Sequence, residues 1–191
     1  GVCVTNALGK RLEVEVRRDG TLHRLVFADN GKVKEPLRKV RSIGARESGT
    51  RIRFWPDPKY FDSAKFVIAD IAALLRAKAM LLPGVQFALG IEKNGKIETQ
   101  TWHFPEGIKG YFADAIADLN PVAETFLGER YIAAQSESDS FTEGEGALWA
   151  AAWTPEGEVV AEAYVNMIPT RQGGTHVSGL REGLYNAIRS F

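Results

Sequence analysis

The chain has 191 residues, of which 45% are hydrophobic and 25% are charged, as in an ordinary soluble globular protein with a sizeable core. Its 24 basic and 24 acidic side chains cancel, which excludes a strong global attraction to nucleic acid but leaves room for a local basic patch. The single cysteine, Cys3, excludes an intramolecular disulfide and favours a reducing, cytoplasmic location, and no run of about 18 apolar residues predicts a membrane helix.

The first part of the chain predicts a short helix at residues 2–8 followed by an antiparallel sheet. Alternation of apolar and charged residues in "RLEVEVRR" is the period of a half-buried strand, and Asp19-Gly20 is a hairpin signal. We expect a meander with one face on a core, in which Ser48-Gly49 separates the last two strands. The predicted strands are RLEVEVRR (11–18), TLHRLVF (21–27), LRKVRSI (37–43) and TRIRFW (50–55).

The middle of the chain predicts a helix and a hairpin. "FVIADIAALLRAKAMLLP" (66–83) is apolar almost all round, which predicts a buried helix that ends before Pro83. The stretches "GVQFALGIE" (84–92) and "KIETQTWHF" (96–104) are predicted strands joined at Asn94-Gly95.

A different pattern begins near Gly107. Residues 107–119 predict a helix with one apolar face, "ERYIAAQ" (129–135) predicts a strand, and the acidic, serine-rich residues 136–146 predict a loop. We expect "ALWAAAWT" (147–154) and "EVVAEAYVNMI" (158–168) to form a hairpin across Pro155-Glu156-Gly157, and a last helix to start after Gly173-Gly174. The apolar face of the helix at 107–119 comprises Ile108, Phe112, Ile116 and Leu119.

The turn in "IPTRQGGTHVSGLREGL" (168–184) has two interpretations. Its glycines can permit a tight strand-to-helix turn while Thr175 caps the helix, or the first helical amides can hold an anion. The residues alone favour the structural interpretation. Arg171 and Arg181 flank the turn, and together with Thr175 they are candidates for a phosphate or DNA contact.

The sequence lacks the common motifs for zinc binding, for a Walker-type phosphate loop and for serine hydrolysis. One cysteine and three scattered histidines match no zinc spacing, and His23 and His103 are predicted to be ordinary strand residues. Neither a Walker loop nor the nucleophile elbow of serine hydrolases occurs. The sequence therefore offers no catalytic residue and no metal ligand of its own.

Four stretches together resemble the B subunits of bacterial type IIA topoisomerases, and the topoisomerase IV version is closer than the gyrase version. The resemblance runs in order over essentially the whole chain. It implies an α+β fold in which residues 1–106 form the C-terminal part of a GHKL (Bergerat) ATPase domain. Residues 107–191 would form the N-terminal part of a transducer domain similar to ribosomal protein S5 domain 2. The four stretches are NALGKRLEVEVRRDG, SGTRIRFWPDPKYF, LRAKAMLLPGV and YVNMIPTRQGGTHVSGLREGL.

The resemblance also implies a function for the complete protein. In this family the B subunit uses ATP with Mg²⁺, dimerises with a second copy when ATP is bound, and captures double-stranded DNA. Together with the A subunit, in a heterotetramer, it passes that duplex through a break in another, which unlinks and relaxes DNA. The implied enzyme is a cytoplasmic isomerase with no membrane partner.

The family's ATP-binding residues carry over to five positions. Gly1 and Val2 match the end of a glycine-valine lid segment whose backbone contacts the phosphates, and Thr50 matches a threonine that helps to hold the adenine. Ile52 matches an apolar wall of the same pocket, and Arg18 an arginine at its mouth. Taken without the resemblance, Arg18 would be an exposed hairpin charge and Ile52 a core strand residue.

The resemblance places other functional groups outside this chain. The family's catalytic glutamate, magnesium-binding asparagine and adenine-reading aspartate would precede Gly1, and the lysine that reaches the γ-phosphate would follow Phe191. Both termini look cut, so we expect a fragment that does not hydrolyse ATP alone. The alternatives are a fragment of the gyrase counterpart, a non-catalytic S5-like nucleic-acid-binding module and a purely structural interaction module.

Overall fold

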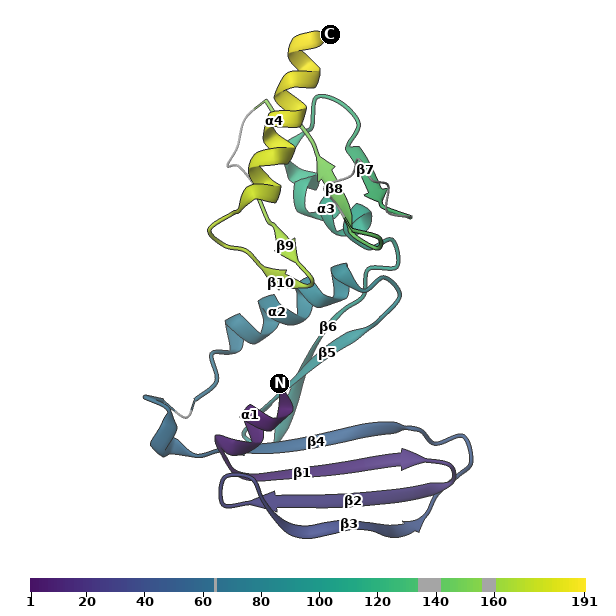
Figure 1. Ribbon diagram of the computed structural model, residues 1–191, viewed down its shortest axis with the longest axis vertical. Helices are drawn as coiled ribbons and strands as arrows, with labels where there is room; N and C mark the ends of the chain where they lie inside the picture. Colours follow the sequence, from purple (N-terminus) through teal and green to yellow (C-terminus); the bar gives the residue numbers. More distant parts are fainter. Residues whose placement is uncertain (64, 134–141, 156–160) are drawn as a thin grey trace. The chain divides into compact units, whose positions relative to one another are not determined.

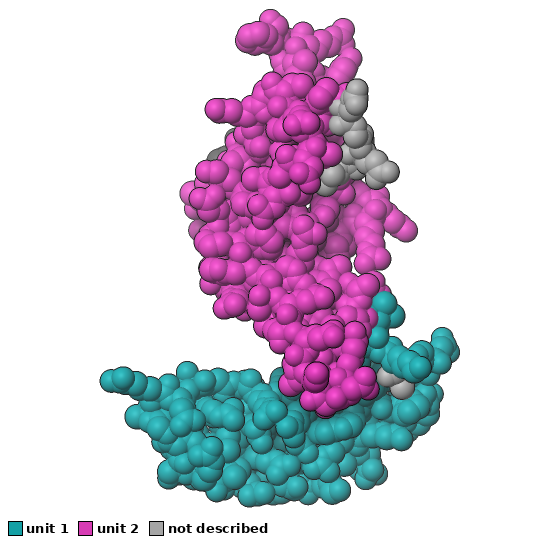
Figure 2. All heavy atoms as spheres, turned by 180° about the vertical axis from the view of Figure 1, so that it is seen from behind, with its two compact units in different colours: residues 1–67 teal, residues 68–191 magenta. Residues whose placement is uncertain are grey.

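The computed structural model describes residues 1–63, 65–133, 142–155 and 161–191, which mix helices and strands as the predicted α+β class requires. The chain divides into two compact units, residues 1–67 and 68–191 (Figures 1 and 2). The domain boundary expected at residue 107 lies inside the second unit and stays a prediction.

The first unit is a four-stranded antiparallel sheet preceded by a short helix (Figure 1). The predicted helix and the first two strands are confirmed, and the hairpin turn has positive φ at both Asp19 (50°) and Gly20 (68°), the geometry that matches strand twist. Its elements are α1 (Val2–Ala7), β1 (Gly9–Arg18), β2 (Thr21–Ala28), β3 (Lys32–Ser42), β4 (Gly49–Pro56) and the 3₁₀ turn η1 (Pro58–Tyr60).

The strand order differs from the predicted meander. The order is β3-β2-β1-β4, so β4 pairs with β1 on the far side of the sheet and not with β3. The turn after β3 lies at Ala45-Arg46, and Gly49 already belongs to β4. Residues 43–48 are long enough to carry the chain to the other edge. The alternation of a strand fixes its faces but not its neighbour, which is why periodicity missed this crossing.

Register separates the sheet into two chemically different faces. Residues that lie opposite each other in antiparallel strands share a face, and β1 is paired on both sides. One side, the apolar face, carries Leu12, Val14, Val16, Leu25, Phe27, Ile52 and Phe54. The other side, the polar face, carries Arg11, Glu13, Glu15 and Arg17 of β1 and the residues that pair with them.

The second unit is built from helices and two-stranded ladders (Figure 1). Strand β5 pairs with β6, β7 with β8, and β9 with β10, all antiparallel. Its elements are α2 (Ile68–Leu81), β5 (Phe87–Lys93), β6 (Lys96–Trp102), α3 (Ile108–Ile116), the 3₁₀ turn η2 (Ala117–Leu119), β7 (Phe126–Tyr131), β8 (Gly146–Ala151), β9 (Tyr164–Val165), β10 (Ile168–Pro169) and α4 (Thr175–Ser190).

Helix α2 and the hairpin after it follow the predictions in most respects. The helix stops before Pro83, and Asn94-Gly95 forms the expected turn with φ of 52° and 73°. Burial is less complete than predicted: Ala77, Ala79 and Met80 are buried, while the N-terminal turns expose apolar residues.

The strands after α3 are paired differently from the predicted hairpin. Strand β8 pairs with β7, and the strands of residues 164–169 pair with each other. The predicted turn at Glu156-Gly157 and most of the acidic loop fall on residues 156–160 and 134–141, outside the described residues. Opposite the aromatic Trp149 stands Gly128, whose missing side chain leaves room for the indole ring.

A polar cluster lies within the second unit and joins three of its segments. The hydroxyl of Tyr111 (α3) donates a 2.6 Å hydrogen bond to Oε1 of Glu162, and the hydroxyl of Tyr164 (β9) donates one of the same length to Oε2. The guanidinium of Arg76 (α2) lies 4.8 Å from the centre of the Tyr111 ring, and Phe104 meets that ring edge-on at 5.3 Å. Burial, and then the hydrogen bond and charge of Glu162, raise the pKa of Tyr111 to about 12.

Gly107 is held in a conformation that only glycine adopts readily, with φ 57° and ψ −132°, and a Cβ there would lie 2.8 Å from Cγ of Pro83. We expect Gly107→Ala to lower the free energy of unfolding by about 1–3 kcal/mol. The matched control is Gly110→Ala in α3, where a Cβ meets only ordinary contact at 3.6 Å and should stabilise by up to about 1 kcal/mol. Urea unfolding of both variants in the full-length protein checks this, and equal effects would contradict it.

The Tyr111–Glu162 bond predicts an alkaline loss of stability. A raised tyrosine pKa means that the folded state keeps the proton more tightly, so the stabilisation is complete below about pH 10 and disappears as the pH rises towards 12. Tyr111→Phe should cost about 1–2 kcal/mol at neutral pH and flatten this dependence. Tyr131, which is exposed, gives the control Tyr131→Phe. Urea midpoints measured at pH 7, 9 and 11 test the difference, and parallel curves for the two variants would count against it.

Candidate functional site

Three of the predicted nucleotide-contacting residues share one end of the apolar face. Thr50 and Ile52 are two residues apart on β4, where they pair with Val16 and Val14 of β1. Arg18 follows Val16 by two residues and therefore points to the same side. The diagonal separation across paired strands, about 7–8 Å between side chains, puts Arg18 within reach of a ligand on Thr50.

Thr50 and Ile52 are both open to a ligand. Ile52 is 52% exposed although it lies among apolar neighbours, and Thr50 is exposed beside it. Thr50 makes no side-chain hydrogen bond within the part of the chain that the structure describes, so its hydroxyl is available to donate or accept. A flat apolar wall with one adaptable hydroxyl suits a planar, polar-edged ring.

Gly1 and Val2 are placed at the other end of β1. Gly1 precedes α1, and its carbonyl accepts hydrogen bonds from the amides of Val4 and Thr5 at 3.0 and 3.3 Å. Helix α1 leads directly into the start of β1, whereas Arg18 ends that strand. Among the described residues, no hydrogen bond or ion pair joins Gly1 or Val2 to the Thr50 end of the face.

A hydrogen-bond cluster fixes the junction between α1, β1 and β4. The amide of Asn30 donates to the Gly9 carbonyl and to Asp57, both at 3.2 Å, and the ammonium of Lys59 donates to Asn30 at 2.7 Å. The Asp57 amide also donates to the Leu8 carbonyl at 3.0 Å. Desolvation alone would raise the pKa of Asp57, but hydrogen bonds from Asn30 and Lys59 outweigh it and hold that pKa below its usual value.

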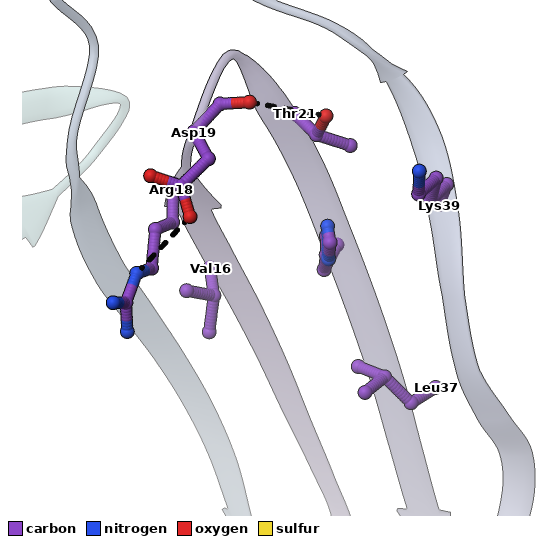
Figure 3. Close-up of a pocket in the computed structure, with 7 residues that line it drawn as sticks. Val16, Arg18, Asp19, Thr21, Leu37 and Lys39 are labelled. Atoms are coloured by element: carbon purple, nitrogen blue, oxygen red, sulfur yellow. Dashed lines mark hydrogen bonds and ion pairs between the residues drawn. The ribbon is translucent and has the colours of Figure 1, made fainter.

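A shallow depression of about 340 Å³ opens on the Arg18 end of the same face (Figure 3). Arg18 alone among the predicted site residues lines it, and its guanidinium pairs with Asp19 at 3.3 Å. Sequence reasoning missed the other lining residues, because they come from three strands whose alignment depends on register. They are Val16, Asp19, Thr21, His23, Leu37 and Lys39.

The polar face contains a buried carboxylate that ties β1 to β2. Glu13 is 8% exposed and accepts hydrogen bonds and ion pairs from Arg11 and Arg24. Burial by itself would raise the pKa of Glu13, but the hydrogen bonds and charges of Arg11 and Arg24 are stronger together, so the pKa lies below its ordinary value. The strands that carry Val16 and His23 on the opposite side are held in register by this cluster.

The turn before α4 corrects one prediction. Thr175 is the first residue of the helix and not its cap: the N-cap is Gly174, and no side chain caps the helix there. The predicted role of the glycines is confirmed, with φ of 77° at Gly173 and 153° at Gly174. Arg171, Thr175 and Arg181 are all exposed, and the hydroxyl that contacts His176 is that of Thr170, at 3.2 Å.

Two features are absent from the described residues. Within residues 1–63, 65–133, 142–155 and 161–191, no three His, Cys, Asp or Glu side chains gather closely enough to hold a metal ion. None of the helices in these ranges combines the length and the apolar character needed to span a bilayer.

Comparisons with known proteins find close relatives along the whole chain. The family model described as DNA gyrase B matches residues 107–191. The B subunit of DNA topoisomerase 4 from Pseudomonas aeruginosa is 45% identical over 195 residues, a match that covers all of this chain and 29% of that protein. The chain therefore spans less than a third of the length of this curated relative.

Two solved structures are similar to this chain over nearly its whole length. The topoisomerase IV ATP-binding domain of Francisella tularensis, in complex with a small-molecule inhibitor, matches with TM-score 0.68 and 37% identity over all of this chain and 48% of that one. The 43K ATPase domain of Thermus thermophilus gyrase B, in complex with an aminocoumarin, matches with TM-score 0.73 and 31% identity over 97% of this chain and 47% of that one.

The lowered pKa of Glu13 predicts an acidic limit to stability. The stabilisation from its arginine pairs is present above the unfolded pKa, about 4.3, and is lost as the pH falls through the lower folded value. Glu13→Gln should reduce stability at pH 7 by about 1–2 kcal/mol and weaken this acid dependence. The control is Glu98→Gln, which removes an exposed carboxylate. Urea unfolding at pH 7, 5 and 3.5 measures both, and an unchanged acid limb in Glu13→Gln would contradict the assignment.

Proposed function

We propose the function of this chain from one premise: it belongs to the family of bacterial type IIA DNA topoisomerase B subunits. Its solved neighbours are GHKL ATPase domains of topoisomerase IV and gyrase B, which confirms the predicted fold class. Identity over the full chain to a topoisomerase 4 relative, at 45%, is higher than the 31% to a gyrase structure. We therefore favour topoisomerase IV, with gyrase B as the alternative.

The proposed function is that of part of the ATPase subunit of a DNA topoisomerase IV, in which ATP binding and hydrolysis drive duplex passage. The observation that carries this proposal is the open apolar end of the sheet, where Thr50, Ile52 and Arg18 meet in a chain that matches ATP-binding domains throughout. In the complete subunit, this passage would separate linked DNA circles and relax supercoils.

The residues at the Thr50 end of the apolar face fit an adenine base. The Ile52 side chain would pack against the flat face of the base, and the Thr50 hydroxyl would bond its edge directly or through water. Arg18 would lie at the mouth of the pocket, and the backbone of Gly1 and Val2 would contact the phosphates. When bound, ATP supplies the phosphate bond whose hydrolysis drives the cycle.

The remaining catalytic groups belong, in this proposal, to other parts of the subunit. An asparagine outside this chain would bind Mg²⁺, a glutamate would activate water, and a lysine would stabilise the charge that develops on the γ-phosphate. The chain alone would then be inactive. Residues 1–106 would complete the ATPase domain and residues 107–191 would begin the transducer, an assignment supported by the start of the gyrase B family match at residue 107.

The proposed partners follow from the same function. The subunit would pair with an A subunit in a heterotetramer, dimerise when ATP binds, and act on double-stranded DNA in the cytoplasm, without a membrane partner. Arg171, Thr175 and Arg181 are exposed around the start of α4 and are the candidates for contact with captured DNA. The charge of the two arginines and the exposure of all three residues support this assignment.

Thr50→Ala in the complete subunit should raise the Kd for ATP about three- to tenfold, because one hydrogen bond to the base is lost. Thr50→Ser keeps the hydroxyl and should bind nearly as tightly as the native protein. The control is Thr99→Ala, which removes an exposed threonine from β6. Isothermal titration of the three variants with a non-hydrolysable ATP analogue decides the matter: equal Kd values for Thr50→Ala and Thr99→Ala would remove Thr50 from the site.

A further inference from the structure

We propose that the polar face of the β3-β2-β1-β4 sheet is a second DNA-contacting surface that binds the sugar–phosphate backbone of a duplex. The inference rests on the proposed function for the presence of DNA as a partner. It concerns a surface separate from the candidates around α4, and it lies on the opposite side of the sheet from Thr50 and Ile52.

Charge is concentrated on this face although the whole chain is neutral. Register places eight basic side chains on it against three carboxylates, those of Glu13, Glu15 and Glu35. The basic residues are Arg11, Arg17, Arg24, Lys32, Arg38, Arg41, Arg51 and Arg53. Such a surplus on one surface is the electrostatic signature of a polyanion site.

Most of this surplus positive charge is not neutralised by carboxylates on the same face. Arg11 and Arg24 share the buried Glu13, and Arg38 pairs with Glu35. In the described part of the chain, no ion pair engages the other basic residues of the face, and among its acidic residues only Glu15 is left to oppose them. These available cations are Arg17, Lys32, Arg41, Arg51 and Arg53.

The available arginines form an ordered array. Arg41 and Arg17 flank Leu22 in one row across the sheet, and Arg51 stands in the next row, opposite Glu15. Strands about 4.8 Å apart and same-face residues about 6.6 Å apart spread these groups over a plane that is wider than a compact anion. Guanidinium groups bind phosphate through paired N–H donors, so the array suits a repeating phosphate backbone.

The face has few of the apolar anchors on which protein partners depend. Leu22 and Val26 lie on it, but both are buried and so offer a partner no exposed apolar surface. Trp55 is exposed, and the Arg11 guanidinium lies 5.8 Å from its ring centre. Protein interfaces usually centre on clustered aromatic and aliphatic residues, so an acidic protein segment is the less favoured occupant.

The test measures DNA binding by the complete subunit carrying Arg17→Gln, Arg41→Gln and Arg51→Gln together. A fluorescent duplex of about 30 base pairs is titrated between about 50 and 200 mM salt, without nucleotide. Each phosphate contact contributes about 0.9 to the salt slope, so the triple variant should lose about 2–3 of that slope and about tenfold or more in affinity. Glu15→Gln, which removes a negative charge from the same face, should tighten binding.

The matched control removes three exposed lysines of the second unit, by Lys93→Gln, Lys96→Gln and Lys109→Gln. Its slope should stay near that of the native subunit. An equal loss in this control, or a native slope in the arginine variant, overturns the proposal. Unchanged DNA binding with weaker association with the A subunit overturns it in favour of an acidic protein surface.

ATP titration of the same variants separates this proposal from the proposed function. We expect all of them to bind ATP as the native protein does, because the substituted arginines lie on the other side of the sheet from Thr50. A native protein that binds no ATP contradicts the proposed function, while the DNA titrations still decide whether the polar face binds the duplex.

Discussion

The pairing of β1 with strands on both of its sides is the constraint on which the rest of the first unit depends. Because β1 is bonded to β2 and to β4, one alternation of side chains sets the chemistry of three strands at once. A shift of one residue would exchange Val14 and Val16 for Glu13 and Glu15 on the face that carries Thr50. The register of β1 therefore determines which face of the sheet is apolar and which face carries the charged side chains.

Two polar clusters secure that register from different directions. At the start of β1, Asn30 and Asp57 bond the backbone on both sides of the α1–β1 junction. In the middle of the strand, Glu13 holds Arg11 and Arg24 in nearly dry surroundings. A buried carboxylate is costly without partners, so a slipped register that separated it from its arginines would be strongly disfavoured. By fixing the register, the two clusters also determine which residues form the apolar face.

Local sequence signals predicted the helices, strands and turns well, because these elements depend mainly on residues that are close together in the chain. The Asp19-Gly20 and Asn94-Gly95 turns and the stop before Pro83 depend on neighbouring residues only, and all three were predicted from the sequence. Strand partners depend on distant segments, so the crossing of β4 and the pairing of β7 with β8 were missed. Thr175 was misassigned because Gly174, one residue earlier, already occupies the cap position.

The candidate site shows the same division. Ile52 and Arg18 have no distinctive local pattern, and only the family resemblance selected them. The Asn30–Asp57 cluster carried a readable signal in part, since Asp before Pro58 is typical of a helix start, but its link to Asn30 spans 27 residues. Composition hid the charge of the polar face, because a net charge of zero averages over surfaces that the fold keeps apart.

Strand β4 brings these arguments together. Its residues 50 and 52 face one way and its residues 51 and 53 the other, so the proposed nucleotide wall and a row of cations are separated by the thickness of a single backbone. A slip of the strand by one residue would move Ile52 to the charged side and Arg51 to the apolar side, so both sets would change together. The same alternation that gives the two faces different chemistry therefore makes them independent in their contacts while they share one register.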